Sequence, residues 1–275
     1  MSLEQPAVFP PRRPWPVDFP PVAIHADESR VKQHPAYPAA KSGDADAALQ
    51  LVQDTLALSA VESLRGLLGT ARPVLVSAHA LEQVGVNAIP EALADELGQL
   101  LDLPVDSSVV QTNVVSHTGA DGFSRLARQA AFAGDILPGA DYVLVDDFVG
   151  QGGTLANLRG LIESCGGRVI AATTLTGKPH SALLAPTIAQ LTLLRNKHGK
   201  DLETWWLTRF GHGFDCLTQS EARYLERTAN ADTIRDRIAA AEQTGNRPAG
   251  ADAPPRQVSN QAPWRGRRRR AGAPR

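Results

Sequence analysis

The sequence predicts an α/β protein with an open, mainly parallel, twisted sheet and a helical C-terminal cap. Three observations predict this fold class. Apolar β-branched runs alternate with segments of helical period between residues 72 and 177, and one such run leads through a glycine-rich turn into a helix. Beyond Gly177, four helical segments follow one another. Because strand–helix–strand crossovers are right-handed, we expect ligands to bind at the carboxyl ends of the strands.

The first half of the chain shows four elements in order. Apolar residues at helical spacing predict a helix over 44–68, with Asp44 as its N-cap. A short strand follows at 73–77, then a helix over 90–101 that has proline in its first turn. A second strand region is expected over 105–115.

Residues 116–139 interrupt this alternation with repeated glycines and aspartates, and they predict a long, mobile surface loop. The next unit is a strand at 142–145, a helix over 154–164 and a strand over 168–176. Helices are then expected over 186–197, 201–209, 218–227 and 232–241. Thr218 to Glu221 forms a capping-box pattern, and Asp232 is expected to cap the last helix.

The two ends differ in composition from the middle. Residues 1–20 are rich in proline without helical or strand period, and residues 245–275 are rich in Pro, Ala, Gly and Arg, so both are expected to be disordered. The folded domain is therefore predicted over 21–244, with a core over 72–177 and a helical cap over 178–244. The arginine run at 265–270 suits either nonspecific contact with nucleic acid or simple solvation.

Composition excludes several classes of protein. The formal net charge of −1 includes the basic tail, so the folded part is acidic and is not expected to bind a bulk polyanion. No apolar run approaches the roughly 20 residues that span a bilayer, and the N-terminus lacks a signal pattern, so a cytoplasmic location without membrane contact is expected. Cys165 and Cys216 show neither metal-ligand spacing nor a disulfide framework. A homodimer is the default expectation for a symmetric assembly.

The stretch from Tyr142 to Leu155 carries the chemistry. Its buried strand ends in Asp146 and Asp147, whose side chains point to opposite faces of an extended chain, so one can face a ligand while the other anchors the loop. The glycines that follow let backbone amides approach an anion, and Thr154 opens a helix with unpaired amides. The alternative is that the acids only cap the helix. A nucleotide-triphosphatase loop is disfavoured because Gly153 stands where that motif has lysine.

This order of acids, loop, Gly-Gly-Thr and helix resembles the 5-phosphoribosyl-1-diphosphate (PRPP) motif of type I phosphoribosyltransferases, and the resemblance extends over about 72–177. It implies that Asp146 and Asp147 receive the ribose hydroxyls, and that Mg²⁺, chelated mainly by PRPP, contacts them only through water or those hydroxyls. It implies a diphosphate loop after the first core strand and two arginine ligands in the mobile loop, Arg125 and Arg128. The residues implied for substrate binding are Val149, Gly150, Gln151, Gly152, Gly153 and Thr154 around the 5′-phosphate, and Ala78, His79 and Ala80 at the diphosphate.

The function implied is transfer of phosphoribosyl from PRPP to a nitrogenous base or nucleotide, with release of diphosphate. Two departures from the family pattern are Gly150, where purine-salvage members carry an acid, and Gln151. A non-catalytic PRPP or nucleotide sensor is therefore the alternative, while a hydrolase and an amidotransferase lack the residues they need. The base is not identified. His212 and the aromatic residues around it suit either a stacking wall for a base or core packing.

Overall fold

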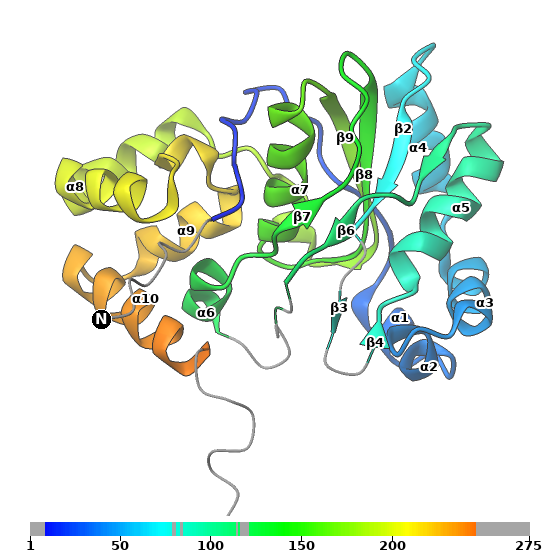
Figure 1. Ribbon diagram of the computed structural model, residues 1–275, viewed down its shortest axis with the longest axis horizontal. Coiled ribbons are helices and arrows are strands. Elements are labelled where there is room, and N and C mark those ends of the chain that lie inside the picture. The colour runs from blue at the N-terminus through cyan, green and yellow to red at the C-terminus, as the bar shows by residue number, and fades with distance from the viewer. Residues whose placement is uncertain (1–8, 79–80, 83–84, 114, 116–120, 246–275) are drawn as a thin grey trace, which may run out of the picture. The chain divides into compact units, whose positions relative to one another are not determined.

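The computed structural model describes residues 9–78, 81–82, 85–113, 115 and 121–245 (Figure 1). Its main sheet has five strands, and every pairing between them is parallel. This confirms the open parallel α/β sheet expected from the sequence. In sheet order the strands are β1 (Ala23–Ala26), β9 (Arg168–Gly177), β8 (Asp141–Val149), β2 (Val74–Ser77) and β5 (Val105–Asp106).

Strand β8 is the central element and is buried on both faces, as a continuous apolar run in a parallel sheet requires. Tyr142 and Leu144 pack into one hydrophobic cluster, and Val143 and Val145 pack into another on the opposite face. The alternation of side chains along the strand therefore divides the core into two layers.

One face of the sheet is covered by the helices of the first hundred residues. Their apolar sides supply Leu51, Leu64, Leu93 and Leu97 to the second cluster, all fully buried. The helices are α1 (Glu28–Lys32), α2 (Tyr37–Lys41), α3 (Ala45–Thr55), α4 (Leu58–Leu68) and α5 (Ile89–Leu101). Asp44 caps α3 as predicted, accepting from the amide of Ala47 at 3.0 Å. The single helix expected over 44–68 is wrong, because Leu56 and Ala57 have extended ψ angles that separate α3 from α4.

The other face carries helix α7 (Gly153–Ser164), with Leu155, Leu158 and Ile162 buried against the sheet. Two antiparallel strand pairs lie outside the main sheet. They are β3 (Leu81–Glu82) with β4 (Gly85–Val86), and β6 (Val110–Gln111) with β7 (Phe132–Ala133). The strand region expected over 105–115 is thus divided between two sheets.

The long loop expected over 116–139 contains regular structure in its described part, residues 121–139. Helix α6 (Gly122–Ala127) begins at Asp121, whose carboxylate accepts from the amide of Ser124 at 2.8 Å. Phe123 and Leu126 are buried in the core of the C-terminal helices. Apolar packing therefore anchors this part of the segment. The sequence did not indicate the short amphipathic helix, because glycines interrupt the apolar pattern around it.

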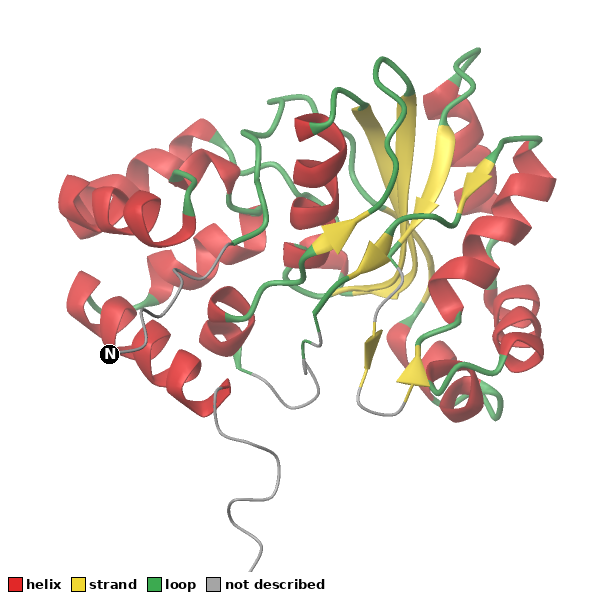
Figure 2. Cartoon of the chain, viewed as in Figure 1, coloured by secondary structure: helices red, strands yellow, loops and turns green. Residues whose placement is uncertain are grey.

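The C-terminal region is helical, as predicted, and has its own hydrophobic core (Figure 2). Its elements are η1 (Pro179–Ser181), α8 (Ile188–Phe210), η2 (Phe214–Cys216), α9 (Gln219–Arg227) and α10 (Ala231–Gly245). Gly199 breaks α8 with a φ of 77°, close to the predicted gap between two helices. Thr218 and Glu221 form the predicted capping box. Asn230, not Asp232, accepts from the first-turn amide of Thr233 in α10.

Residues 9–20 lack helix and strand but are bound to the body, contrary to the disordered arm expected there. Trp15 and Phe19 are buried in the same cluster as α7, and the guanidinium of Arg159 lies 4.5 Å from the Trp15 ring. The segment crosses α7 at Gly160, where an added Cβ would lie 1.8 Å from the Pro11 carbonyl oxygen. Proline composition misled here because the stabilising contacts are with distant residues. Residues 1–8 and the Arg-rich tail at 246–275 lie outside the described residues.

None of the described helices has the length and apolar composition needed to cross a membrane.

Candidate functional site

The motif lies where the sequence predicted, at the carboxyl end of β8, where the chain turns into α7. Gly152 makes the turn with a φ of 81°, in the left-handed region that favours glycine. A side chain there would also collide with Leu184, whose Cδ2 lies 2.7 Å from the position of an added Cβ. Both constraints explain the glycine immediately before the helix.

The two acids of the motif have different environments. Asp146 is 6% exposed, and its Oδ1 accepts from the amide of Asp147 at 2.8 Å, so it anchors the turn. Burial raises the pKa of Asp146 well above its usual value, and the neighbouring charge of Asp147 raises it further. Asp147 is half-buried and accepts from Lys41 Nζ at 3.0 Å. Asp147 is therefore the more accessible carboxylate of the pair.

Helices α1 and α2 bring two lysines to this side of the motif. Lys41, at the end of α2, makes the ion pair with Asp147, and Lys32 Nζ lies 5.0 Å from the centre of the Phe148 ring. Neither lysine was a predicted site residue. The sequence offers no local signal for Lys41, since 106 positions separate it from Asp147.

The loop at 150–152 has free hydrogen-bond donors. Its backbone amides donate no hydrogen bond to any described residue, and the helix that follows contributes the unpaired amides of its first turn. Gly150, Gln151, Gly153 and Thr154 are half-exposed. Free amides at a helix N-terminus attract an anion, and this part of the site is open to one.

Beside the loop lies an open pocket of about 160 Å³. Its walls come from Gly150 and Gln151, from α6, from the segment after β9, and from α9. Four of its lining side chains carry a permanent positive charge: Arg125, Lys178, Arg223 and Arg227. The other lining residues are His180, Ser181, Ser220 and Tyr224, so no carboxylate is among them.

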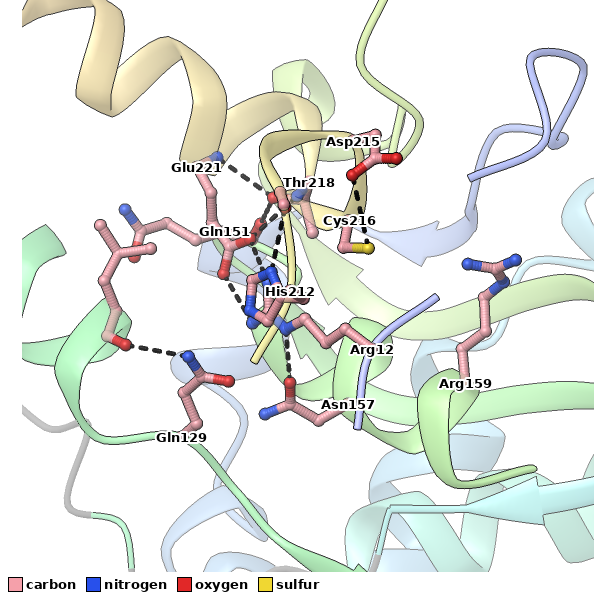
Figure 3. Close-up of polar contacts among 12 residues, drawn as sticks. Arg12, Gln129, Gln151, Asn157, Arg159, His212, Asp215, Cys216, Thr218 and Glu221 are labelled. Atoms are coloured by element: carbon pink, nitrogen blue, oxygen red, sulfur yellow. Dashed lines mark hydrogen bonds and ion pairs between the residues drawn. The ribbon is translucent and has the colours of Figure 1, made fainter. Parts of the chain in front are cut away.

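A buried polar network holds the opposite side of the loop against α9 (Figure 3). Arg12 makes a double hydrogen bond to Glu221, at 2.7 and 3.0 Å, and its Nε donates to Asn157 Oδ1 on α7 at 2.6 Å. Thr218 Oγ1 donates to the carbonyl of Gln151 at 2.5 Å, and the Thr218 amide donates to Glu221. The side chains of Arg12 and Glu221 are 1% and 2% exposed. The network therefore fixes the loop from inside the protein.

Of the two arginines and the diphosphate loop inferred from the sequence, only Arg125 is seen beside the motif. Arg125 lies beside the motif, with Nη1 3.3 Å from the position of an added Cβ on Gly150. Arg128 follows α6, its Nε donates to the Ser124 carbonyl at 3.4 Å, and it does not line the pocket. Ala78 is fully buried, and its amide donates to Val145 at 2.9 Å. His79 and Ala80 lie outside the described residues.

The aromatic residues near His212 belong to the core of the C-terminal helices. Trp206, Phe210 and Phe214 are at most 2% exposed, and the Trp206 ring contacts the other two, so a stacking wall for a base is wrong for these three rings. His212 is also buried, and burial followed by the charge of Arg12 lowers its pKa to about 3. Of the two readings left open by the sequence, core packing is the one observed.

The residues present give little support for a protein-built metal site. The described part of the chain contains no group of three His, Cys, Asp or Glu side chains placed to hold a metal. Asp146 and Asp147 offer the oxygen ligands that Mg²⁺ prefers, but one anchors the turn and the other pairs with Lys41. They fit an indirect contact with Mg²⁺ carried by a phosphorylated ligand.

Two curated proteins are similar in sequence to the chain. Protein TraN of Escherichia coli is 42% identical over 230 residues, which are 84% of this chain and 51% of TraN. A protein of Haemophilus influenzae is 43% identical over 152 residues, 55% of this chain and 34% of its own length. No family model matches the chain. The chain therefore spans about half, or less, of the curated relatives it matches.

Among solved structures, an adenine phosphoribosyltransferase matches 55% of this chain and 75% of its own, with 12% identity and a TM-score of 0.34. A purine phosphoribosyltransferase from Pyrococcus horikoshii matches 49% of this chain and 73% of its own, with 19% identity and a TM-score of 0.30. A proposal of function therefore rests on the site itself. The site combines a carboxylate pair, a loop of free amides and a cationic pocket at one edge of the sheet.

Proposed function

We propose that the chain binds PRPP at the 146–154 motif and transfers its phosphoribosyl group to a nitrogen atom of an acceptor. One observation carries this proposal. On a single sheet edge, the acids of β8 are followed by a half-exposed loop whose amides have no described partner. Carboxylates suit the hydroxyls and developing cation of a ribose, and free amides suit its 5′-phosphate.

The reaction is a displacement at the anomeric carbon. The C1–O bond to diphosphate breaks, and its electron pair leaves with the diphosphate. The acceptor nitrogen supplies the pair for the new C1–N bond, and its proton passes to solvent or to the released diphosphate. Positive charge develops on the ribose ring, so a nearby carboxylate stabilises the transition state. Asp147 is suited to this task because it is the more accessible acid.

The chain's other residues would position the donor. The amides of residues 150–154 would hold the 5′-phosphate at the N-terminus of α7, and Asp146 would keep the turn in place. Lys41 pairs with Asp147 and would contact an anionic donor bound beside this carboxylate. Arg125 would add positive charge beside Gly150. Mg²⁺ bound with the donor would neutralise charge on the diphosphate, and Asp146 and Asp147 would contact it only indirectly.

A non-catalytic PRPP or nucleotide sensor is the second candidate, and Gly150 favours it. No side chain at this position can move a proton to or from a base, and Asp146 and Asp147 are both engaged within the protein. Such a protein would bind the same donor through the same loop and release no diphosphate.

Following diphosphate release separates the two. Purified protein with PRPP, Mg²⁺ and a panel of bases and nucleotides should release diphosphate with at least one acceptor, and Asp147→Asn should abolish this release. Binding of PRPP without release from any acceptor would favour the sensor. Failure to bind PRPP would reject both.

A further inference from the structure

The cationic pocket shares its walls with the loop that the proposed function gives to a phosphate. Gly150 and Gln151 line the pocket, and both belong to the half-exposed loop whose backbone amides have no partner among described residues. The Nη1 atom of Arg125 comes within 3.3 Å of the position of an added Cβ on Gly150, so a positive charge lies against the loop backbone. An anion bound to this loop would therefore lie next to the charges of the pocket.

The C-terminal region supplies the other walls of the pocket, and it supplies hydrogen-bond donors. Ser220, Arg223, Tyr224 and Arg227 are spaced by three or four positions on α9, so they share one face of that helix. Ser181, in η1, lies beside them, and its hydroxyl oxygen is 3.0 Å from that of Ser220. Guanidinium groups only donate, and hydroxyl groups can donate. The face of α9 that lines the pocket is therefore suited to an acceptor of hydrogen bonds.

The arginines of this face have no counterion in the described part of the chain. Neither Arg223 nor Arg227 forms a salt bridge with a residue that the structure describes. Arg223 donates only to neutral acceptors, the His180 carbonyl at 3.3 and 3.5 Å and Gln219 Oε1 at 2.8 Å. The Nε of Arg125 is buried without a described partner. Like charges gathered in one hollow repel each other and raise the local concentration of anions.

The size and the donors of the pocket fit a single phosphate group. About 160 Å³ is less than the roughly 300 to 1,000 Å³ of pockets that enclose drug-sized ligands, so the pocket suits one small group of a ligand. A guanidinium can bind two phosphate oxygens at once, and hydroxyls and backbone amides can donate to the oxygens that remain. A phosphate monoester carries close to two negative charges at neutral pH, so it can balance more than one arginine.

We propose that the loop and α9 form one phosphate site, in which Arg223 and Arg227 bind the same phosphate as the amides of residues 150–154. This inference rests on the proposed function, which makes that group the 5′-phosphate of the donor. The C-terminal helices are then part of the donor site as well as its support. Asp147 recognises the ribose hydroxyls, whereas α9 recognises the charge of the phosphate.

Two partial ligands separate the two phosphorylated ends of the donor. Calorimetry would measure ribose 5-phosphate, which carries only the 5′-phosphate, and inorganic diphosphate with Mg²⁺. Arg223→Gln and Arg227→Gln should each weaken ribose 5-phosphate about tenfold, because each removes charge-assisted hydrogen bonds to the phosphate. The affinity for diphosphate should stay unchanged in both variants, and PRPP should weaken as ribose 5-phosphate does.

Control variants distinguish a phosphate contact from a general effect of charge or folding. Arg227→Lys should retain part of the affinity for ribose 5-phosphate, because it keeps the charge and loses the planar donor group. Arg235→Gln removes an arginine that pairs with Asp232 outside the pocket, so it should change nothing. The wild type should bind ribose 5-phosphate more weakly as salt is raised, and Arg227→Gln should show a smaller salt dependence. Thermal melting would verify that all variants are folded.

The outcomes separate this inference from the proposed function. PRPP binding that depends on Asp147 but on neither Arg223 nor Arg227 would keep the proposed function and overturn the shared phosphate site. A loss of diphosphate binding in the two arginine variants, with ribose 5-phosphate unchanged, would assign the pocket to the diphosphate and overturn it too, as would a wild type that does not bind ribose 5-phosphate. Ribose 5-phosphate that binds through both arginines, while PRPP releases no diphosphate with any acceptor, would support the phosphate site and reject the proposed transfer.

Discussion

Glu221 and Arg223 lie two positions apart on helix α9, yet the first charge is buried in an ion pair and the second has no counterion among the described residues. Glu221 is buried and fully bonded by Arg12 and Thr218, while Arg223 lines an open pocket with three other cations. Glu221 lies against Gly153 at the start of α7, and Arg223 lines the pocket together with Gly150 and Gln151 of the loop that precedes this helix. A charge that is paired with an opposite charge inside the protein fixes structure, whereas a charge left without a counterion in the protein is available to a ligand. The two sides should therefore respond differently to mutation.

The largest effect on stability is expected from Arg12→Ala. This change leaves the Glu221 carboxylate buried without its counterion, which costs about 3 to 5 kcal/mol of unfolding free energy. Urea unfolding would measure the loss. The double variant Arg12→Met with Glu221→Leu should lose less, because it removes both charges together. A loss below about 1 kcal/mol in Arg12→Ala would show that residues 9–20 do not hold the cap.

Acidification should weaken the same buried side. The pKa of His212 is lowered to about 3 in the folded protein, so the unfolded chain takes up its proton first. His212 therefore contributes full stability above about pH 6.5, and by pH 4 this contribution falls by about 3 kcal/mol. Unfolding free energy measured from pH 7 to pH 4 should fall more steeply in the wild type than in His212→Asn. Parallel curves for the two proteins would contradict this assignment.

A smaller loss is expected where the N-terminal segment crosses α7. Gly160→Ala places a methyl group against the Pro11 carbonyl and should destabilise by about 1 to 3 kcal/mol. Gly66→Ala is the matched control, since Gly66 lies in α4 with open space around it and alanine favours a helix. Thermal melting should show opposite shifts for the two variants. A Gly160→Ala protein as stable as the wild type would mean that residues 9–15 can move away from α7 at no cost.

The open side should show the smallest effect on stability. Arg227→Gln removes a charge that has no salt bridge among described residues, so unfolding free energy should change by less than about 0.5 kcal/mol, or rise slightly as repulsion in the pocket decreases. Chemical denaturation would measure this. A loss as large as that of Arg12→Ala would show that Arg227 is structural and would remove the contrast between the two sides.

The sequence predicted what local patterns determine. Alternation of apolar runs gave β8, α7 and β9, and the spacing of Thr218 and Glu221 gave the cap of α9, because periodicity and capping depend on neighbouring residues. Such local patterns do not predict contacts between residues that are far apart in the sequence. Arg12 and Glu221 are 209 positions apart, so no local pattern shows that the proline-rich segment binds the body. Helix α6 is not predicted from the sequence, because the glycines of this segment obscure the helical spacing of its buried residues Phe123, Leu126 and Ala127.

The candidate site likewise contains residues that local sequence patterns predict and residues that only the fold brings together. The acids and the glycine loop were predicted from their order along the chain, whereas Lys41 reaches them only through the fold. One signal for the pocket was present in the sequence. Ser220, Arg223, Tyr224 and Arg227 follow helical spacing on α9 and therefore share one face. Only the fold shows that this face of α9 lies beside Gly150, since the sequence pattern alone is equally compatible with a face exposed to solvent.

Binding of PRPP by the motif is the central claim, and calorimetry with Mg²⁺ tests it most directly. The wild type should bind PRPP, and Asp146→Asn with Asp147→Asn should weaken binding about tenfold or more, because the ribose hydroxyls lose the Asp147 carboxylate and the turn loses its Asp146 anchor. Asp141→Asn is the matched control, since Asp141 begins the same strand and pairs with Arg168 away from the motif. It should bind PRPP as the wild type does. Equal PRPP affinity in the double variant, or no binding by the wild type, would contradict the account.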